Sequence, residues 1–486
     1  MTTQPTASAG TGSWEPVIGL EIHVQLATRT KMFCGCELSF GEPPNTRTCP
    51  VCLGLPGTLP VVNARAVHFG LMMGLALECE IAPRSIFHRK NYFYPDQAKN
   101  YQISQYDIPL CGAGRLGDVR LHRIHLEEDA AKLVHIGASG RIHGADASIV
   151  DYNRGGTPLC EIVTEPDIQS AEHARDWLNL LRVTLRQLGV SDVNMEEGSL
   201  RCDANVSVRR AGAGELGTKT ELKNMNSFRF LERGVNAEIE RQIALLESGE
   251  TVVQETLHFD PAGGRLSSLR SKEEAHDYRY FPEPDLVPLV PTEAMLAAAR
   301  EALPELPAVR AARYERDWSL PEDPARLLAY EPQWGDYFEA VATATQARAD
   351  GRAAANWVEQ LRARIGAEAE PAASRVTPPA LARLVGLVVA RQVNAGAARQ
   401  VLDRLVAEGG EPADIVEREG LGSLDGGDEL AGVVAAAIAA NADAAEKVRA
   451  APGLAHHEAD DRPHRLVVAG ADGGDVGRLI REQLGL

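Results

Sequence analysis

Apolar and polar residues alternate in several short stretches of the N-terminal part of the chain, which is the pattern of half-buried β-strands. Residues 17–26 and 200–208 both show this period of two, and residues 219–223 show it over a shorter stretch. We therefore expect three strands, each with one apolar face and one polar face. Their polar positions are Glu21, His23, Gln25, Arg201, Asp203, Asn205, Ser207, Lys219, Glu221 and Lys223.

Helical spacing replaces this alternation further along the chain. Apolar residues recur every three or four positions in residues 228–246, which predicts a helix ending near Gly249. From about residue 292 the sequence becomes rich in Ala, Leu, Arg and Glu, and several prolines mark the change. We expect an α+β protein: a disordered tail (1–13), a mostly antiparallel-sheet cradle body (14–291), an all-α connector (292–409) and a small helical tail domain (410–486).

Length and charge limit the classes of protein that fit. The 486 residues allow two to four domains, and the excess of 68 acidic over 50 basic residues gives a net charge of −18. This charge argues against a protein that coats nucleic acid, because such binding depends on neutralising phosphates. No apolar run is long enough for a membrane span, and residues 1–13 lack the features of a secretory signal. We expect a cytoplasmic protein with no membrane partner.

Four of the eight cysteines form the sharpest local signal. A CxC pair and a CxxC pair are separated by twelve residues rich in turn formers, and their members are Cys34, Cys36, Cys49 and Cys52. Two such pairs suit a tetrahedral zinc ion, and a closed four-thiolate site is structural rather than catalytic. Free buried thiols or a redox pair are the alternatives. We assign the scattered Cys79, Cys111, Cys160 and Cys202 to core packing.

The acidic residues suggest a second kind of site. Glu21 and His23 share one face of the first expected strand, a combination that can hold a divalent cation. Further acidic groups occur as Glu127, Glu128 and Asp129 after His125, as Glu165 and Asp167, and as Glu196 and Glu197. Oxygen ligands with nearby Lys and Arg are what a magnesium–nucleotide site needs, whereas a solvated charged surface is the alternative for each run. Residues 212–220 resemble a P-loop but place the lysine one position late, so we expect a hairpin loop there.

Read in order, these segments resemble the B subunits of the aspartyl/glutamyl-tRNA(Asn/Gln) amidotransferases. The resemblance rests on the blocks at residues 17–24, 89–96, 101–105, 125–129, 155–159, 195–205, 221–224 and 277–285. It implies a ligase that forms a carbon–nitrogen bond with glutamine as the nitrogen donor, in a heterotrimer with an amidase (the A subunit) and a small third protein (the C subunit). The B subunit would use ATP and Mg²⁺ to phosphorylate the side-chain carboxylate of Asp-tRNA(Asn) or Glu-tRNA(Gln), and ammonia would then displace the phosphate.

The resemblance also implies roles for single residues. Glu21, His23 and Glu128 would be magnesium ligands, with Glu127 beside them, and the same cradle would be lined by Glu165, Glu197, Arg201, Asp203 and Asn205. Phosphate or ammonia-path contacts would come from Lys90, Lys99, Lys219 and Lys223, for which surface salt bridges are the alternative. The cysteines would bind a structural Zn²⁺ that the chemistry does not need, and the tail would hold the tRNA by its shape and backbone.

Two other functions remain open at this point. A non-catalytic, zinc-containing protein for tRNA binding or assembly would carry the same cysteines, with its acidic faces as mere surface. A free-standing ATP-dependent ligase acting on small acids would turn over without tRNA, although the long helical tail argues against it.

Overall fold

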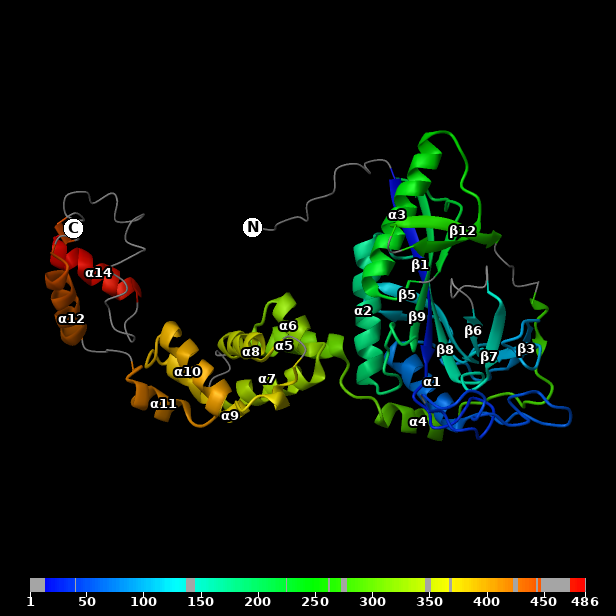
Figure 1. Cartoon of the computed structure of the whole chain (residues 1–486), viewed down its shortest axis with the longest axis horizontal. Coiled ribbons are helices and arrows are strands. Elements are labelled where there is room, and N and C mark those ends of the chain that lie inside the picture. Colours follow the sequence, from blue (N-terminus) through cyan, green and yellow to red (C-terminus); the bar gives the residue numbers. More distant parts are fainter. Residues whose placement is uncertain are drawn as a thin grey trace. The chain divides into compact units, whose positions relative to one another are not determined.

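The computed structural model describes residues 14–39, 41–136, 145–223, 225–260, 263–271, 278–345, 351–366, 369–422, 427–442, 445–446 and 473–485. The chain forms two compact units, Met1–Pro307 and Ala308–Leu486 (Figure 1). The expected tail at residues 1–13 lies outside the described residues, and the other expected domain limits stay predictions.

An eight-stranded sheet forms the centre of the first unit (Figure 1). All its neighbouring strands pair antiparallel except β10 and β11, which confirms the expected mostly antiparallel α+β body. In spatial order the strands are β12 (Arg265–Ser271), β11 (Glu255–Asp260), β10 (Thr220–Lys223), β9 (Leu200–Arg210), β1 (Trp14–Gln25), β8 (Pro158–Thr164), β5 (Val119–Glu128) and β4 (Gly114–Leu116).

Two smaller sheets accompany the large one. A three-stranded sheet consists of β13 (Phe281–Pro282), β2 (His88–Asn91) and β3 (Tyr101–Ser104), and brings residues near 281 beside residues near 89. A two-stranded hairpin pairs β6 (Lys132–Ile136) with β7 (Ala147–Asp151). The three-stranded sheet packs against the large sheet, because its strand β3 contacts β5.

Four helices of the first unit share one apolar core with the large sheet. They are α1 (Ala64–Ala76), α2 (Ala171–Gln187), α3 (Phe228–Glu247) and α4 (Glu293–Glu301). α3 confirms the predicted helix, and it begins where the Ser227 hydroxyl accepts a hydrogen bond from the Phe230 amide. It packs against β9 and α2, and apolar residues such as Ile22, Leu178 and Val235 form one core between these elements. Burial of the apolar positions leaves the alternate, polar positions of β1 and β9 on the opposite face.

The second unit is helical throughout its described residues. Its helices are α5 (Pro307–Trp318), α6 (Glu322–Ala329), α7 (Pro332–Ala344), α8 (Gly351–Ile365), α9 (Pro378–Val389), α10 (Ala395–Glu408), α11 (Pro412–Glu419), α12 (Gly427–Ala440) and α14 (Gly473–Leu484), with a short 3₁₀ turn at Pro371–Ala373. Its core contains Tyr314, Trp334 and Phe338. None of the helices that the structure describes has both the length and the apolar content that crossing a bilayer requires.

Candidate functional site

The register of the large sheet brings polar residues from four strands together. His23 on β1 lies directly opposite Glu161 on β8 and, on its other side, opposite Arg201 on β9. Glu161 in turn lies opposite His125 on β5. Directly opposite residues of antiparallel strands project to the same face, so strands far apart in sequence share one polar surface.

On this surface, histidine nitrogens and carboxylate oxygens lie close enough together to bind one metal ion. His23 Nε2 lies 3.3 Å from Glu161 Oε2, 3.7 Å from Glu127 Oε1 and 4.0 Å from Glu21 Oε1. His125 Nε2 lies 3.4 Å from the same Glu161 oxygen and 3.7 Å from Glu127 Oε2. We call Glu21, His23, His125, Glu127 and Glu161 the carboxylate–histidine cluster. It contains two groups that could each hold a metal ion, and both groups use Glu161.

Mutual attraction dominates the electrostatics of this cluster. Burial alone would lower the pKa of His23, but its hydrogen bond to Glu161 and the charges of Glu161, Glu127 and Glu21 raise that pKa to about 9. Burial would raise the pKa of Glu161, but His125, His23 and Lys90 hold it well below its usual range. Without a metal the cluster thus keeps its central carboxylate ionised and His23 protonated, and a metal ion bound to His23 would displace the proton from the imidazole.

Cationic side chains border the cluster. Burial would lower the pKa of Lys90, but the charges of Glu127 and Glu161 raise it. Arg123 Nη2 lies 3.6 Å from Glu161 Oε1. Lys223 Nζ lies 2.7 Å from Asp203 Oδ2, and burial, which would lower the pKa of Lys223, is outweighed by Asp203 and Glu221, which raise it. The surface therefore combines acidic groups with partly buried ammonium and guanidinium groups.

Glu128 does not belong to this cluster, although the sequence suggested that it would lie with Glu21 and His23. It forms an ion pair with Lys99 and accepts a hydrogen bond of 3.0 Å from the Ile103 amide. Successive residues of a strand point to opposite faces, so Glu127 faces His23 and Glu128 faces away. The neighbours of His23 are therefore Glu127 and Glu161, and the expected grouping with Glu128 is corrected.

Glu161 is the cluster member that sequence reasoning missed entirely. It is the one acidic residue of β8, whose sequence PLCEIVT otherwise looks like a buried strand. A carboxylate inside an apolar strand is costly unless it is paired, which is the signal that could have identified it. His125 belongs to one of the matching sequence blocks, but the sequence suggested no role for it. It is two residues from Glu127 and therefore lies on the same face of β5.

The other predicted residues are spread around the cluster. Arg201 pairs with Asp129 at 3.1 Å, and Glu197 and Arg201 line one cavity. Asn205 lies opposite Gly19 and Glu221 in the sheet, which places it on the same polar face as Asp203. Glu165 pairs with His122 at 2.9 Å, outside the cluster, and Lys219 is exposed just before β10. Asn224, the last residue of one motif, lies outside the described residues.

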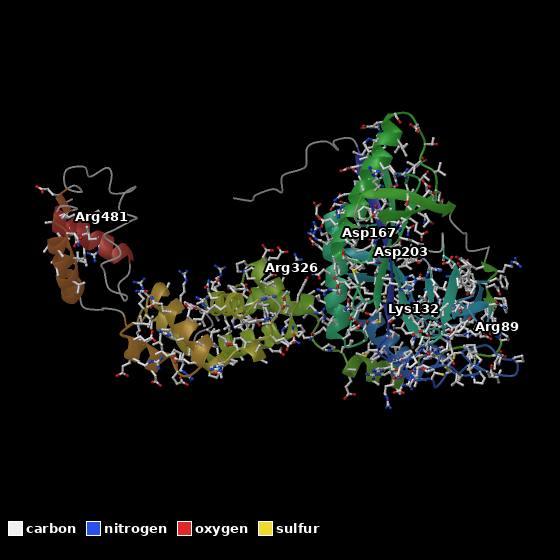
Figure 2. All side chains as sticks on the ribbon, viewed as in Figure 1. Arg89, Lys132, Asp167, Asp203, Arg326 and Arg481 are labelled. Carbon is white, nitrogen blue, oxygen red and sulfur yellow. The ribbon has the colours of Figure 1, made fainter. Side chains whose placement is uncertain are left out.

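An aromatic segment borders the cluster on the side of the small sheet. Tyr280 stacks on Tyr106 with ring centroids 4.4 Å apart, and Lys90 Nζ lies 4.7 Å from the centroid of the Tyr278 ring. The segment is held by Arg89, whose guanidinium donates hydrogen bonds of 2.7 and 2.8 Å to the buried Glu283 carboxylate. Figure 2 shows Arg89 and Asp203 on the same unit. This positioning by Arg89 was not predicted.

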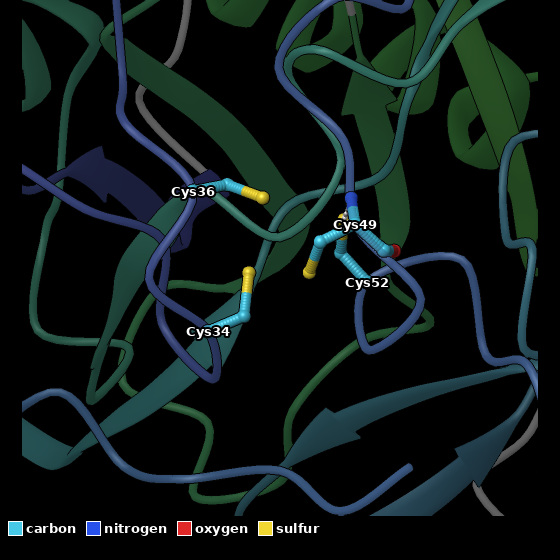
Figure 3. A group of neighbouring side chains, drawn as sticks. All are labelled: Cys34, Cys36, Cys49 and Cys52. Carbon is cyan, nitrogen blue, oxygen red and sulfur yellow. Dashed lines mark hydrogen bonds between the residues drawn. The ribbon is translucent and has the colours of Figure 1, made fainter. Parts of the chain in front are cut away.

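The four clustered cysteines form a separate candidate metal site, with their sulfur atoms turned toward one another (Figure 3). All four sulfurs lie within 4.8 Å of each other. Four thiolates bound to zinc at about 2.3 Å place their sulfurs about 3.8 Å apart, so the donor set and spacing fit a zinc ion. A hydrogen bond from Cys34 lowers the pKa of Cys52 to about 4, so one thiolate is already favoured without a metal.

Comparison with known proteins gives consistent matches along the chain. Residues 16–297 match the GatB/GatE catalytic domain, and residues 336–455 match the GatB domain. The B subunit of the aspartyl/glutamyl-tRNA(Asn/Gln) amidotransferase of Anaeromyxobacter sp. (strain K) is 49% identical over 90% of this chain and 91% of its own. The B subunits of the same enzyme from Frankia casuarinae (48% identity; 99% and 98% covered) and Thermosynechococcus vestitus (46%; 93% and 92%) are similarly close.

Proposed function

The chain belongs to the family of aspartyl/glutamyl-tRNA(Asn/Gln) amidotransferase B subunits, and on this premise we propose that it activates and amidates the amino acid of a misacylated tRNA. The substrate is Asp-tRNA(Asn), Glu-tRNA(Gln) or both. A side-chain carboxylate oxygen attacks the γ-phosphorus of ATP and ADP leaves. Ammonia, which the partner amidase releases from glutamine, then attacks the acyl carbon; phosphate leaves, and the side chain becomes an amide.

The carboxylate–histidine cluster is the observation that carries this proposal. A carboxylate is a poor electrophile, so its conversion to an acyl phosphate needs two anions, the carboxylate and the γ-phosphate, to approach each other. A magnesium ion supplies the charge that offsets their repulsion. Each of the two candidate groups draws its oxygen and nitrogen ligand atoms from two strands, and the atoms of a group lie within 4.8 Å of one another. Lys90 and Lys223 supply positive charge at the border of the cluster.

We assign the roles of single residues from their positions. Glu21, His23, Glu127 and Glu161 are the proposed magnesium ligands, with His125 completing the second group. Lys90 and Lys223 would contact phosphate oxygens, and the cradle around them would be lined by Glu197, Arg201, Asp203 and Asn205. Glu165 and Lys219 lie outside the carboxylate–histidine cluster. We assign them only to contacts at the edge of the cradle.

Lys99 and Glu128 have a different proposed role. They form a buried ion pair beside a cavity, and we assign them to the ammonia path rather than to the metal. The four cysteines would hold a structural Zn²⁺. The partners would be the tRNA, which the helical tail would hold by its shape and backbone, and two further proteins, the amidase (the A subunit) and the small C subunit.

A reconstituted complex tests the activity directly. It is mixed with misacylated tRNA, Mg-ATP and ammonium chloride, and both ADP and the amidated aminoacyl-tRNA are measured over time. We expect one ADP per amide formed and no ADP with deacylated tRNA. Amide formation that is independent of ATP would contradict the proposal, and so would turnover of free aspartate or glutamate.

The same assay distinguishes the proposed activity from the non-catalytic alternative. If the chain only bound tRNA or assembled its partners, Glu161→Gln would leave ADP formation unchanged as long as the complex still forms. We expect instead that this variant binds tRNA normally, as measured by filter binding, and loses ADP formation at low magnesium concentrations.

A further inference from the structure

The four-cysteine site and the Lys99–Glu128 ion pair border the same small cavity. Cys34 and Cys52 line this cavity of about 100 Å³ together with Lys99 and Glu128. The ion pair is buried, with side chains 9% and 4% exposed. A buried pair depends strongly on its geometry, because neither charge can be solvated if the other moves away.

The turn that carries the second cysteine pair supports Lys99. Residues 49–55 close this turn through hydrogen bonds of Leu53 N to Cys49 O and of Leu55 N to Pro50 O, at 3.1 and 2.9 Å. Gly54 follows Cys52 by two residues and has a φ of +66°. A Cβ on Gly54 would lie 2.6 Å from Lys99 Cγ and 3.1 Å from Lys99 Cα, so the lysine rests directly on this backbone.

A second contact runs through Lys31, which is 1% exposed. Its Nζ lies 3.8 Å from Cys52 Sγ and donates a 2.9 Å hydrogen bond to Tyr152 O. Its Cδ lies 3.3 Å from the position that a Cβ on Gly156 would take, and Glu128 Oε2 lies 3.8 Å from that same position. Lys99 thus rests on the cysteine turn itself, and Glu128 lies near Gly156, which also borders Lys31, a residue in contact with Cys52.

We propose that a metal ion bound by the four cysteines positions Lys99 against Glu128, and does more than stabilise the loop that binds it. This inference uses the structural zinc of the proposed function. Zinc bound by four thiolates contributes folding energy to a small loop that has little core of its own. Loss of the metal frees the turn at residues 49–55, and the side chain of Lys99 then loses the surface on which it packs. The four-cysteine site would therefore affect the amidation reaction through Lys99 and Glu128, whereas the sequence led us to expect a zinc ion that the reaction does not need.

Amine labelling of the purified full-length chain tests this without relying on activity. The acylation rate of Lys99 is measured by mass spectrometry in wild type and in Cys36→Ser, and the metal content of each is determined. Cys36 is a proposed ligand whose side chain does not line the cavity, so Cys36→Ser removes a metal ligand without changing a side chain beside Lys99. The exposed Lys132 serves as internal control. We expect loss of the metal and about a tenfold faster acylation of Lys99, with Lys132 unchanged.

Chelation of the wild-type chain gives a second route to the metal-free state if Cys36→Ser does not fold, and the same increase is expected. Gly54→Ala should retain the metal but accelerate Lys99 acylation, since the added methyl group displaces the lysine. Metal loss with unchanged Lys99 acylation overturns the inference, as does a wild-type chain that binds no metal. ATP-dependent amidation is measured separately on the wild-type complex, so a failure of the proposed activity is distinguishable from a failure of this inference.

Discussion

Replacing Glu161 by glutamine tests the composition of the carboxylate–histidine cluster. One oxygen of this residue lies 3.3 Å from His23 Nε2 and 3.4 Å from His125 Nε2, so Glu161→Gln removes one negative charge from both candidate ligand groups. At an effective dielectric constant of about 20, a carboxylate oxygen and a magnesium ion at the ligand distance of about 2 Å attract each other by roughly 16 kcal/mol. Desolvation and the remaining amide oxygen offset most of this, which leaves about 3 kcal/mol, or roughly 100-fold in affinity.

The assay is tRNA-dependent ADP formation by the complex as a function of magnesium concentration at saturating ATP. We expect the half-maximal magnesium concentration to rise by roughly 100-fold in Glu161→Gln. Glu128→Gln is the matched control: it removes the same charge from a buried glutamate, but one that pairs with Lys99. Its magnesium dependence should match that of wild type, whatever its effect on rate. Equal magnesium dependence in the two variants would refute the assignment of Glu161 as a ligand.

Three further predictions concern stability and thiol chemistry. Arg89→Met removes two hydrogen bonds and the paired charge from the buried Glu283 carboxylate and leaves it only the bond from the Asp285 amide. Urea unfolding should therefore show a loss of about 2 to 3 kcal/mol, against less than about 1 kcal/mol for the control Arg209→Met, which breaks the surface pair of Arg209 with Glu15. Phe338→Ala, at a fully buried position, should lower the unfolding free energy of the helical unit by about 3 to 5 kcal/mol. In chelated native protein, iodoacetamide should spare Cys79, Cys111, Cys160 and Cys202, which the fold buries, and intact mass should show modification only of the partly exposed Cys34, Cys36, Cys49 and Cys52. Protection of these last four by added Zn²⁺ would support the metal site; modification of all eight would contradict the burial argument.

Periodicity predicted the elements that carry the site. The alternation in residues 17–26 and 200–208 corresponds to β1 and β9, and the helical spacing after residue 228 corresponds to α3. Local patterns of this kind are reliable because the side-chain period of a strand or helix is fixed by the backbone. The spacing of the four cysteines is equally local, and the structure brings their sulfurs together.

Which acidic residues meet His23 could not be read from such patterns. Glu127 and Glu128 are adjacent in sequence and equally acidic, and only the register of β5 against β8 decides which of them faces the cluster. A shift of one residue would exchange them. Glu161 depended on the same register, since its own strand gave no polar alternation.

The sequence by itself thus determined the class of fold, the family and the grouping of the four cysteines, because each depends on residues close together in the chain or on motifs as a whole. The tertiary structure alone decided that Glu161 joins His23 to His125, that Glu128 instead pairs with Lys99, and that the cysteine turn supports that pair. These contacts join residues far apart in sequence, and strand register and packing across a cavity set them, neither of which leaves a local pattern in the chain.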